Sequence, residues 1–383
     1  MTTTGFVPPP YPQDRLDDLR ARAAEVTGGC VDTSIGTPVD PMPAVAVRVL
    51  ADAAAGATGY PPSVGTPALR EAAAGWMERR FGAGVPADRV IACVGTKEVV
   101  ASLPHLLSLR DPGRDTVLYP AVSYPTYEMG ARLAGLRAVA VPVDEQWHLD
   151  VERVPPGDAE RALVLWLNEP ANPTGASTAA ADLAALVEWG RRHGVVVASD
   201  ECYAEFTYDA AGAPAPPVTA LSSGVEGVLV VHSLSKRSNM AGLRAGFVAG
   251  DADLVRYLGE VRRHAGLIVP TPVQAAAAAA LADDTHVDEQ RERYRRRRAA
   301  AMTALEGFGL VLAGGPSTFY LWLRDGDGAG DGWNVASRLA ERGLVVAPGE
   351  LYGPDGMDHV RLSLTVSDER LELALDRLAA APV

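Results

Sequence analysis

Short apolar runs in the first two thirds of the chain constrain the fold more than any other feature of the sequence. These runs are 116–120, 138–143, 161–167, 194–201, 228–236 and 245–250. Most are apolar at consecutive positions, which is typical of strands that are buried on both faces of a sheet. Between 161–167 and 194–201 we expect a helix that Ser177 or Thr178 caps and Gly194 ends. The pattern predicts an α/β fold whose parallel sheet is covered by helices.

The last third of the chain has a different pattern. Long helices are expected over 273–284 and on to about residue 306, followed by short apolar runs and a final helix from Ser367. We interpret this part as a smaller α+β unit that packs with about the first 40 residues. The predicted domains are an N-terminal arm with part of the small domain (1–40), a large domain (41–272), and an interdomain helix with the C-terminal small domain (273–383).

The charge balance disfavours some partners. The 35 basic and 48 acidic residues give a formal net charge of −13, which argues against a nucleic-acid or anionic-membrane partner. The basic run 291–298 follows an acidic stretch at helical spacing, so we interpret it as a solvated helix face. No apolar run approaches the roughly 18 residues of a membrane span, and the N-terminus lacks a secretory pattern. We expect a cytoplasmic location.

Neither a disulfide nor a metal site is expected. Cys30, Cys93 and Cys202 are odd in number, lie far apart and lack metal-ligand spacing, which fits a reducing compartment. The stretch 325–332 resembles a calcium loop, but Ala329 stands at a ligand position. We expect an acidic surface loop there.

Lysine is almost absent from the chain, and this makes its two lysines informative. Lys97 and Lys236 are the only two among 35 basic residues, as in a composition that replaces lysine with arginine. Arginine stays charged, whereas a desolvated lysine can lose its proton and act as a nucleophile. A lysine that survives this bias is a candidate catalytic amine.

Three polar residues lie at the carboxyl ends of predicted strands, where open parallel sheets bind their ligands. Asp200 and Lys236 each end a strand, and Asn172 lies in the turn after a third one. No glycine-rich dinucleotide motif follows a strand, and no P-loop is present. We expect a carboxylate, an amine and an amide to meet in one crevice.

The motifs around these residues resemble the fold-type I aminotransferases that use pyridoxal phosphate. They are SLSKRSNMAGLRAG from Ser233, NPTG at 172–175, DECY at 200–203 and GY at 59–60, in the order and spacing of that family. The resemblance implies a large domain with a mostly parallel seven-stranded sheet, a small α+β domain, and a homodimer. It also implies pyridoxal phosphate as the cofactor, with amino-acid and 2-oxo-acid substrates.

Further motifs resemble the actinobacterial N-succinyldiaminopimelate aminotransferases. These are GTPVDP (36–41), GTKE (95–98), YPTYE (124–128), SDECY (199–203) and HSLSKRSNMAG (232–242). The implied reaction transfers the amino group between N-succinyl-LL-2,6-diaminopimelate and 2-oxoglutarate, in lysine and diaminopimelate biosynthesis. Alternatives are an aspartate, aromatic or secondary-metabolite aminotransferase, or a carbon–sulfur lyase. A regulator that binds the cofactor is disfavoured because no helix-turn-helix pattern precedes the first motif.

The same resemblance implies a role for each residue near the cofactor ring. Lys236 would form the internal aldimine and then carry the proton between substrate and cofactor. Asp200 would pair with the pyridinium nitrogen. Tyr203 and Asn172 would hydrogen-bond the 3′ oxygen and lower the aldimine pKa, and Tyr124 would stack on the ring.

The implied phosphate site combines charge with oriented donors. Its residues are Arg244, Ser233, Ser235 and the segment Gly95, Thr96 and Lys97, whose backbone amides begin a helix. On this interpretation Lys97 contributes its backbone rather than its amine. Tyr60 would reach the phosphate of the neighbouring subunit.

For the substrate, the resemblance implies that Arg361 grips the α-carboxylate, a task suited to a planar guanidinium. The backbone at Gly36, and the side chain of Asn172, would meet the same group. The residues that bind the far end of the substrate are not identified, and Arg262, Arg263 and His264 are the weak candidates.

Overall fold

The computed structural model describes residues 5–328 and 330–380; Ala329 of the predicted acidic loop lies outside them. Within these residues the helices are α1 (Asp17–Ala24), α2 (Ala44–Ala54), α3 (Pro67–Phe81), α4 (Thr96–Arg110), α5 (Thr126–Leu133), α6 (Pro156–Arg161), α7 (Ala180–His193), α8 (Leu234–Arg237), α9 (Ala252–His264), α10 (Thr271–Ala282), α11 (Thr285–Gly307), α12 (Gly332–Ala340) and α13 (Asp368–Ala379). The strands are β1 (Val31–Asp32), β2 (Val90–Cys93), β3 (Thr116–Pro120), β4 (Arg137–Val141), β5 (Ala162–Asn168), β6 (Val196–Asp200), β7 (Val228–Ser233), β8 (Gly246–Gly250), β9 (Leu310–Leu312), β10 (Tyr320–Asp325), β11 (Leu344–Val345), β12 (Ala347–Pro348) and β13 (Val360–Ser363).

A seven-stranded sheet forms the larger part of the molecule, with the strand order β2-β8-β7-β6-β5-β3-β4. All neighbouring strands in it are parallel except at β8, which runs antiparallel to both β2 and β7. The predicted α/β class and the mostly parallel seven-stranded sheet are therefore confirmed.

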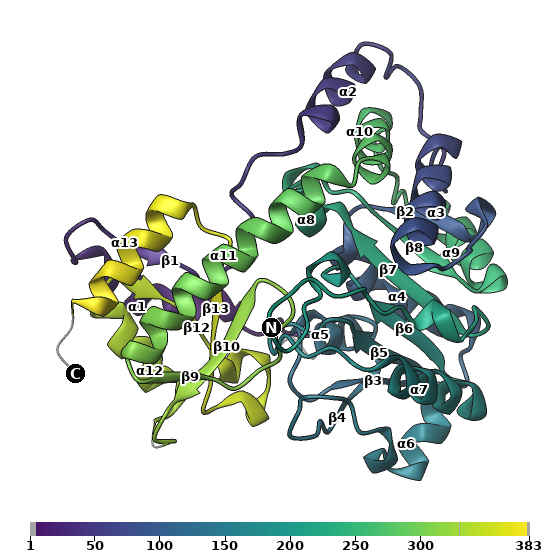
Figure 1. The fold of residues 1–383 in the computed structure, drawn as a ribbon. Coiled ribbons are helices and arrows are strands. Elements are labelled where there is room, and N and C mark those ends of the chain that lie inside the picture. The colour runs from purple at the N-terminus through teal and green to yellow at the C-terminus, as the bar shows by residue number, and fades with distance from the viewer. Residues whose placement is uncertain (1–4, 329, 381–383) are drawn as a thin grey trace.

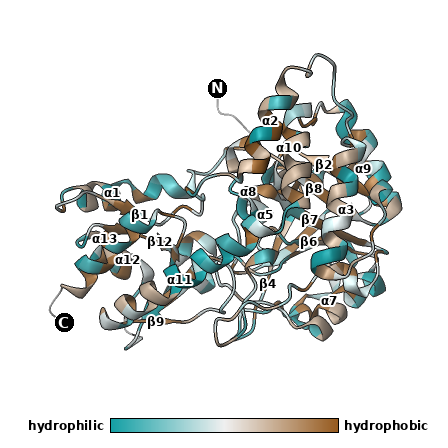
Figure 2. Ribbon diagram, turned by 45° about the horizontal axis from the view of Figure 1, so that its top comes forward, coloured by the Kyte–Doolittle hydropathy of each residue, from teal (hydrophilic) through white to brown (hydrophobic). Residues whose placement is uncertain are grey.

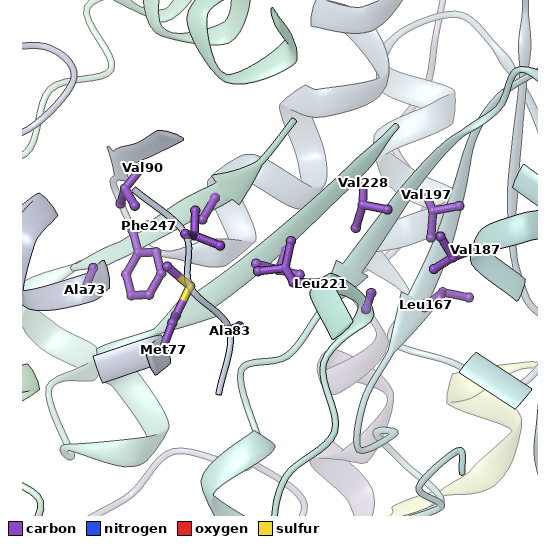
Figure 3. Packing of buried hydrophobic residues seen from close by; sticks show 14 of the residues in the cluster. Ala73, Met77, Ala83, Val90, Leu167, Val187, Val197, Leu221, Val228 and Phe247 are labelled. Atoms are coloured by element: carbon purple, nitrogen blue, oxygen red, sulfur yellow. The ribbon is translucent and has the colours of Figure 1, made fainter. Parts of the chain in front are cut away.

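Helices cover both faces of this sheet, as the doubly apolar strands require. One face packs against α3, α7 and α10, and Figure 3 shows part of this core, where Met77 and Ala73 lie near Phe247 and Val187 lies near Val197. The other face packs against α4, α5 and α9. The ribbon coloured by hydropathy agrees, because the sheet strands are mainly hydrophobic and the surrounding helices are mixed (Figure 2). The carboxyl ends of the central strands are left free for a ligand.

A smaller unit is built from both ends of the chain (Figure 1). Its four-stranded antiparallel sheet has the order β12-β13-β10-β9, and β1 pairs in parallel with β11. Leu16 and Leu19 from the N-terminal segment share a core with β10, β13 and α13. The first residues of the chain therefore pack against its C-terminal part. The exact boundaries of the domains (1–40, 41–272 and 273–383) stay a prediction.

Two local predictions near the site were wrong. The helix α7 begins at Ala180 with Ala179 as its cap, because Thr178 instead bonds to the buried carboxylate of Glu169. Lys236 does not end a strand: β7 stops at Ser233, and Lys236 lies in the short helix α8. Gly194 ends α7 in the left-handed conformation, as expected.

The basic run 291–298 is only partly a solvated face. Arg295 and Arg296 are exposed, but Arg297 is buried and forms ion pairs with Asp40 and Asp368. The helix α11 runs between the two units (Figure 1), so one of its faces is buried by both. Helical spacing alone could not reveal this second neighbour.

Among residues 5–328 and 330–380, no helix is both long and apolar enough to cross a membrane.

Candidate active site

A pocket of about 840 Å³ lies where the carboxyl ends of the large-sheet strands face the small unit. All the predicted site residues line it except Tyr60, Gly95 and the three candidates for the far end of the substrate. Those that line it are Gly36, Thr96, Lys97, Tyr124, Asn172, Asp200, Tyr203, Ser233, Ser235, Lys236, Arg244 and Arg361. Residues separated by more than three hundred positions in the sequence thus meet in one cavity.

Lys236 reaches the pocket from α8, directly after β7. The Ser233 side chain accepts a hydrogen bond from the backbone N–H of Ser235 (3.1 Å), which caps the start of this short helix. The Lys236 amine donates to the carbonyl of Gly36. Burial lowers the pKa of Lys236 to about 8. About a tenth of this amine is therefore neutral, and nucleophilic, at pH 7, far more than for an ordinary lysine.

Asp200 lies at the end of β6 and is 4% exposed. Its Oδ2 accepts a hydrogen bond from the Tyr127 hydroxyl (3.1 Å) and its Oδ1 accepts one from the Cys202 backbone (3.3 Å). Burial raises the pKa of Asp200, and the hydrogen bonds from Cys202 and Tyr127 oppose this rise. Such a carboxylate is suited to bind a cationic N–H group inside the pocket.

Arg244 forms one side of an anion site at the N-terminus of α4. Its guanidinium donates to the carbonyls of Ala241 (3.0 Å) and Val94 (3.4 Å) and has no carboxylate partner within the described residues. A Cβ on Gly95 would lie 2.3 Å from Arg244 Nη2, so glycine alone allows this close approach. A free guanidinium beside the N-terminus of a 15-residue helix favours a phosphate or another anion.

Arg361 enters the pocket from β13 in the small unit. It is 4% exposed and donates to Asn172 Oδ1 (2.8 Å) and to the carbonyl of Ser34 (2.6 Å). Its guanidinium carbon lies 4.1 Å from the ring centre of Tyr320 and 4.9 Å from that of Tyr352. The buried Nε of Arg361 has no hydrogen-bond partner among the described residues. A donor left unpaired in this way points to a missing acceptor, such as a carboxylate.

Lys97 presents its amine to the pocket, which the sequence analysis did not foresee. The Nζ atom lies 3.3 Å from the Tyr11 hydroxyl and 6.0 Å from the ring centre of Tyr124. Burial lowers the pKa of Lys97, but its contacts with Tyr124 and Tyr11 outweigh burial, and the net direction is upward. Within the described residues the partners of this ammonium are the two tyrosines, and it forms no ion pair with a carboxylate.

Several predicted residues lie elsewhere. Tyr60 is fully exposed outside the pocket. Arg262 is buried in an ion pair with Glu98 (2.6 Å), while Arg263 and His264 are exposed. None of the three weak candidates lines the pocket of this chain.

Sequence reasoning also missed four tyrosines that line the pocket: Tyr11, Tyr127, Tyr320 and Tyr352. The three-residue spacing of Tyr124, just before α5, and Tyr127, in its first turn, was a usable signal. For Tyr320 the signal was absent, because its place depends on the register in which β10 pairs with β13, Tyr320 opposite Ser363.

Comparison with known proteins identifies the family. Residues 30–378 match the family model described as aminotransferase class I and II.

Individual relatives agree with this match over nearly the full chain. The chain is 45% identical to the 4-dedimethylamino-4-oxo-anhydrotetracycline transaminase OxyQ of Streptomyces rimosus, covering 97% of this chain and 99% of the relative. It is 34% identical to an LL-diaminopimelate aminotransferase of Aquifex aeolicus, covering 97% of this chain and 96% of the relative. Among solved structures, a probable N-succinyldiaminopimelate aminotransferase from Thermus thermophilus is similar with a TM-score of 0.85 and 31% identity, covering 97% of this chain and 100% of that one.

Proposed function

The chain belongs to the aminotransferase class I and II family, and we propose that it transfers an amino group between N-succinyl-LL-2,6-diaminopimelate and 2-oxoglutarate. The chain is a pyridoxal-phosphate-dependent aminotransferase, as its family relationship establishes. The choice of substrate is our inference from the charges in the pocket.

The side chains of the pocket fit the cofactor. We assign the phosphate to Arg244, Ser233, Ser235 and the amides at the start of α4, where a guanidinium without a carboxylate partner meets a helix N-terminus. We assign the ring nitrogen to Asp200, the ring face to Tyr124, and the covalent attachment to Lys236. Bound pyridoxal phosphate withdraws electrons from the substrate and thereby acidifies its Cα–H bond.

The other tasks of catalysis belong to the chain itself. Arg361 and Asn172 bind the α-carboxylate and so orient the Cα–H bond toward Lys236. Lys236 takes this proton as a neutral amine, which its lowered pKa of about 8 favours. Tyr203 and Asn172 would donate hydrogen bonds to the 3′ oxygen of the cofactor, and the buried Asp200 would hold a proton on its ring nitrogen.

The observation that carries the substrate proposal is the position of Lys97. Its ammonium faces the pocket beside Tyr11 and Tyr124, without a carboxylate partner among the described residues. Arg361 offers the second cationic group, with an unpaired Nε. A substrate with a carboxylate at each end satisfies both cations, and 2-oxoglutarate and N-succinyldiaminopimelate are such molecules.

A second candidate is a polycyclic ketone or its amine, as in secondary metabolism. The 45% identity to the anhydrotetracycline transaminase favours it, and a pocket of about 840 Å³ has room for a large substrate. Both candidates share the cofactor residues, so only the far end of the substrate distinguishes them.

Single-turnover loss of the cofactor absorbance separates the candidates. Purified holoenzyme is mixed with glutamate, N-succinyl-LL-diaminopimelate, LL-diaminopimelate, aspartate, tyrosine or an amino-anhydrotetracycline. We expect rapid reaction with glutamate and the succinylated donor and slow reaction with aspartate and tyrosine. Fast reaction of the tetracycline amine with no reaction of the succinylated donor would establish the second candidate.

The variant Lys97→Met tests the charge directly. Loss of one charged hydrogen bond costs about 1.5–3 kcal/mol, so KM for glutamate should rise by about 10- to 100-fold. KM for alanine, which has no distal carboxylate, should change little. Equal effects on glutamate and alanine would show that Lys97 does not bind the far end of the substrate.

We also infer that the active enzyme is a homodimer. Tyr60 is fully exposed, and Val47 on α2 and Val39 before it are exposed apolar residues. The α2–α10 pair projects from the large unit (Figure 1), and a second copy of the chain would cover this surface and receive Tyr60.

A further inference from the structure

Tyr320 contacts both sides of the candidate site, although it belongs to neither set of predicted residues. Its hydroxyl lies 3.1 Å from the hydroxyl of Tyr203, within hydrogen-bond distance. Its ring lies under the guanidinium of Arg361, with 4.1 Å between ring centre and Cζ. One buried side chain, 2% exposed, therefore touches the expected partner of the cofactor oxygen and the expected carboxylate-binding group.

Hydrogen bonds to its backbone and close contacts at its hydroxyl surround Tyr320 in this place. Its N–H donates to Thr318 Oγ1 (3.0 Å), and its carbonyl accepts from Arg298 Nη1 (3.2 Å). On the ring side, a Cβ at Gly36 would lie 1.9 Å from the Tyr320 hydroxyl oxygen. The hydroxyl thus lies between Gly36 and Tyr203, and glycine at position 36 leaves the space that it occupies.

We propose that Tyr320 is a positioning residue that acts through Tyr203, by donating a hydrogen bond to the Tyr203 oxygen, and through Arg361, by supporting its guanidinium. This proposal rests on the proposed function, because it assumes that Tyr203 faces the cofactor. A phenol that accepts one hydrogen bond becomes a better donor in the next one, since such bonds polarise one another. Tyr320 therefore strengthens the donation from Tyr203 to the cofactor oxygen.

Two substitutions of Tyr320 distinguish its hydrogen bond to Tyr203 from its support of Arg361. Tyr320→Phe keeps the ring under Arg361 and removes only the hydroxyl, whereas Tyr320→Leu removes both. Tyr352→Phe is the matched control, because Tyr352 also stacks on Arg361 (4.9 Å), while Tyr320 is the hydrogen-bond partner of the Tyr203 hydroxyl within the described residues.

A pH titration of the absorbance of the bound cofactor tests the role of the Tyr320 hydroxyl. A weaker donor at the 3′ oxygen of the cofactor leaves more negative charge on that oxygen. This charge retains the proton on the nitrogen that joins Lys236 to the cofactor, so the titration midpoint should move upward. In Tyr320→Phe we expect a rise of about half a unit to one unit, with no shift in Tyr352→Phe. Tyr320→Leu should in addition raise the KM for glutamate by about tenfold, through loss of the ring under Arg361.

A double variant keeps the test decisive. If Tyr320 acts through Tyr203, adding Tyr320→Phe to Tyr203→Phe should not shift the midpoint further. An unchanged midpoint in Tyr320→Phe, or an equal further shift in the Tyr203→Phe background, would overturn the proposal. Circular dichroism would show whether a Tyr320 variant fails to fold. In that case the titration midpoint of Tyr203→Phe is compared with that of the wild type, and an unchanged midpoint would contradict a role of Tyr320 through Tyr203. A wild-type protein without a pH-dependent cofactor absorbance would instead contradict the proposed function.

Discussion

At the scale of single residues, the two lysines are set apart by their surroundings. Burial lowers the pKa of Lys236 to about 8, while the net shift in the pKa of Lys97 is upward. Only the neutral amine attacks an aldehyde, so pyridoxal phosphate should react with Lys236 and leave Lys97 free. The rate at which the apoprotein binds pyridoxal phosphate covalently should increase with pH, with a midpoint at about pH 8, because deprotonation of the Lys236 amine creates the nucleophile.

Borohydride reduction and peptide mapping check this expectation. The modified peptide should contain Lys236 at every pH, and Lys236→Ala should remove the chromophore while Lys97→Arg keeps it. A phosphopyridoxyl group on Lys97 would contradict the assignment.

At the scale of elements, the end of β6 carries two adjacent carboxyls that point to opposite faces of the sheet. Asp200 faces the pocket, whereas Glu201 accepts a hydrogen bond from the Ala220 N–H (2.9 Å) and lies 3.3 Å from His232 Nε2 on β7. Burial raises the pKa of Glu201 to about 8 and lowers the pKa of His232 to about 3. Near neutral pH this contact therefore brings a neutral acid close to a neutral imidazole.

The variant Glu201→Gln tests that protonation state. Because the folded pKa of about 8 lies above the ordinary value of 4.5, the stability that Glu201 contributes is full below about pH 4.5 and is lost as the pH rises toward 8. Glutamine mimics the neutral acid and does not titrate. In urea unfolding of the apoprotein, the wild type and Glu201→Gln should have similar free energies of unfolding near pH 4.5. Above pH 8 the variant should be more stable than the wild type by a few kcal/mol, at about 1.4 kcal/mol per unit of pKa shift. The control Glu201→Ala should be less stable than Glu201→Gln at both extremes of pH. If the free energies of unfolding of the wild type and Glu201→Gln changed in parallel with pH, Glu201 would be ionised in the folded protein.

The elements also show how far sequence reasoning reaches. The strands of the large sheet were predictable because a strand buried on both faces has a continuous apolar sequence, such as 161–167. The antiparallel direction of β8 and the position of Lys236 in α8 were not, because they depend on the turns after β7 rather than on hydrophobic pattern. The ion pairs of Arg297 with Asp40 and Asp368 join distant segments, and no local spacing encodes them.

The candidate site divides in the same way. Asp200, Asn172 and Arg244 were predictable from motifs whose order matches the family. Tyr320 and the pocket-facing amine of Lys97 were not, because each depends on how the small unit and the N-terminal segment close over the sheet.

At the scale of the whole molecule, we propose that each active site of the homodimer is built from two chains, with the exposed Tyr60 crossing the interface. If its hydroxyl reaches the phosphate bound by the neighbouring subunit, Tyr60→Phe removes one hydrogen bond to a charged group, a loss of roughly 1.5–3 kcal/mol. The affinity for pyridoxal phosphate should then fall by about 10- to 100-fold, and dilution to a monomer should abolish activity. Fluorescence titration of the apoprotein with the cofactor measures this change.

A mixed dimer separates a shared site from one built within a single chain. A Tyr60→Phe chain is paired with a Lys236→Ala chain, so that only the site on the first chain keeps Lys236. That site borrows Tyr60 from its partner if the residue crosses the interface, and it should then bind pyridoxal phosphate as tightly as the wild type. Binding as weak as in the Tyr60→Phe homodimer would place the tyrosine in its own chain's site. Because Tyr60 is fully exposed and lies outside the pocket of its own chain, we expect the wild-type affinity.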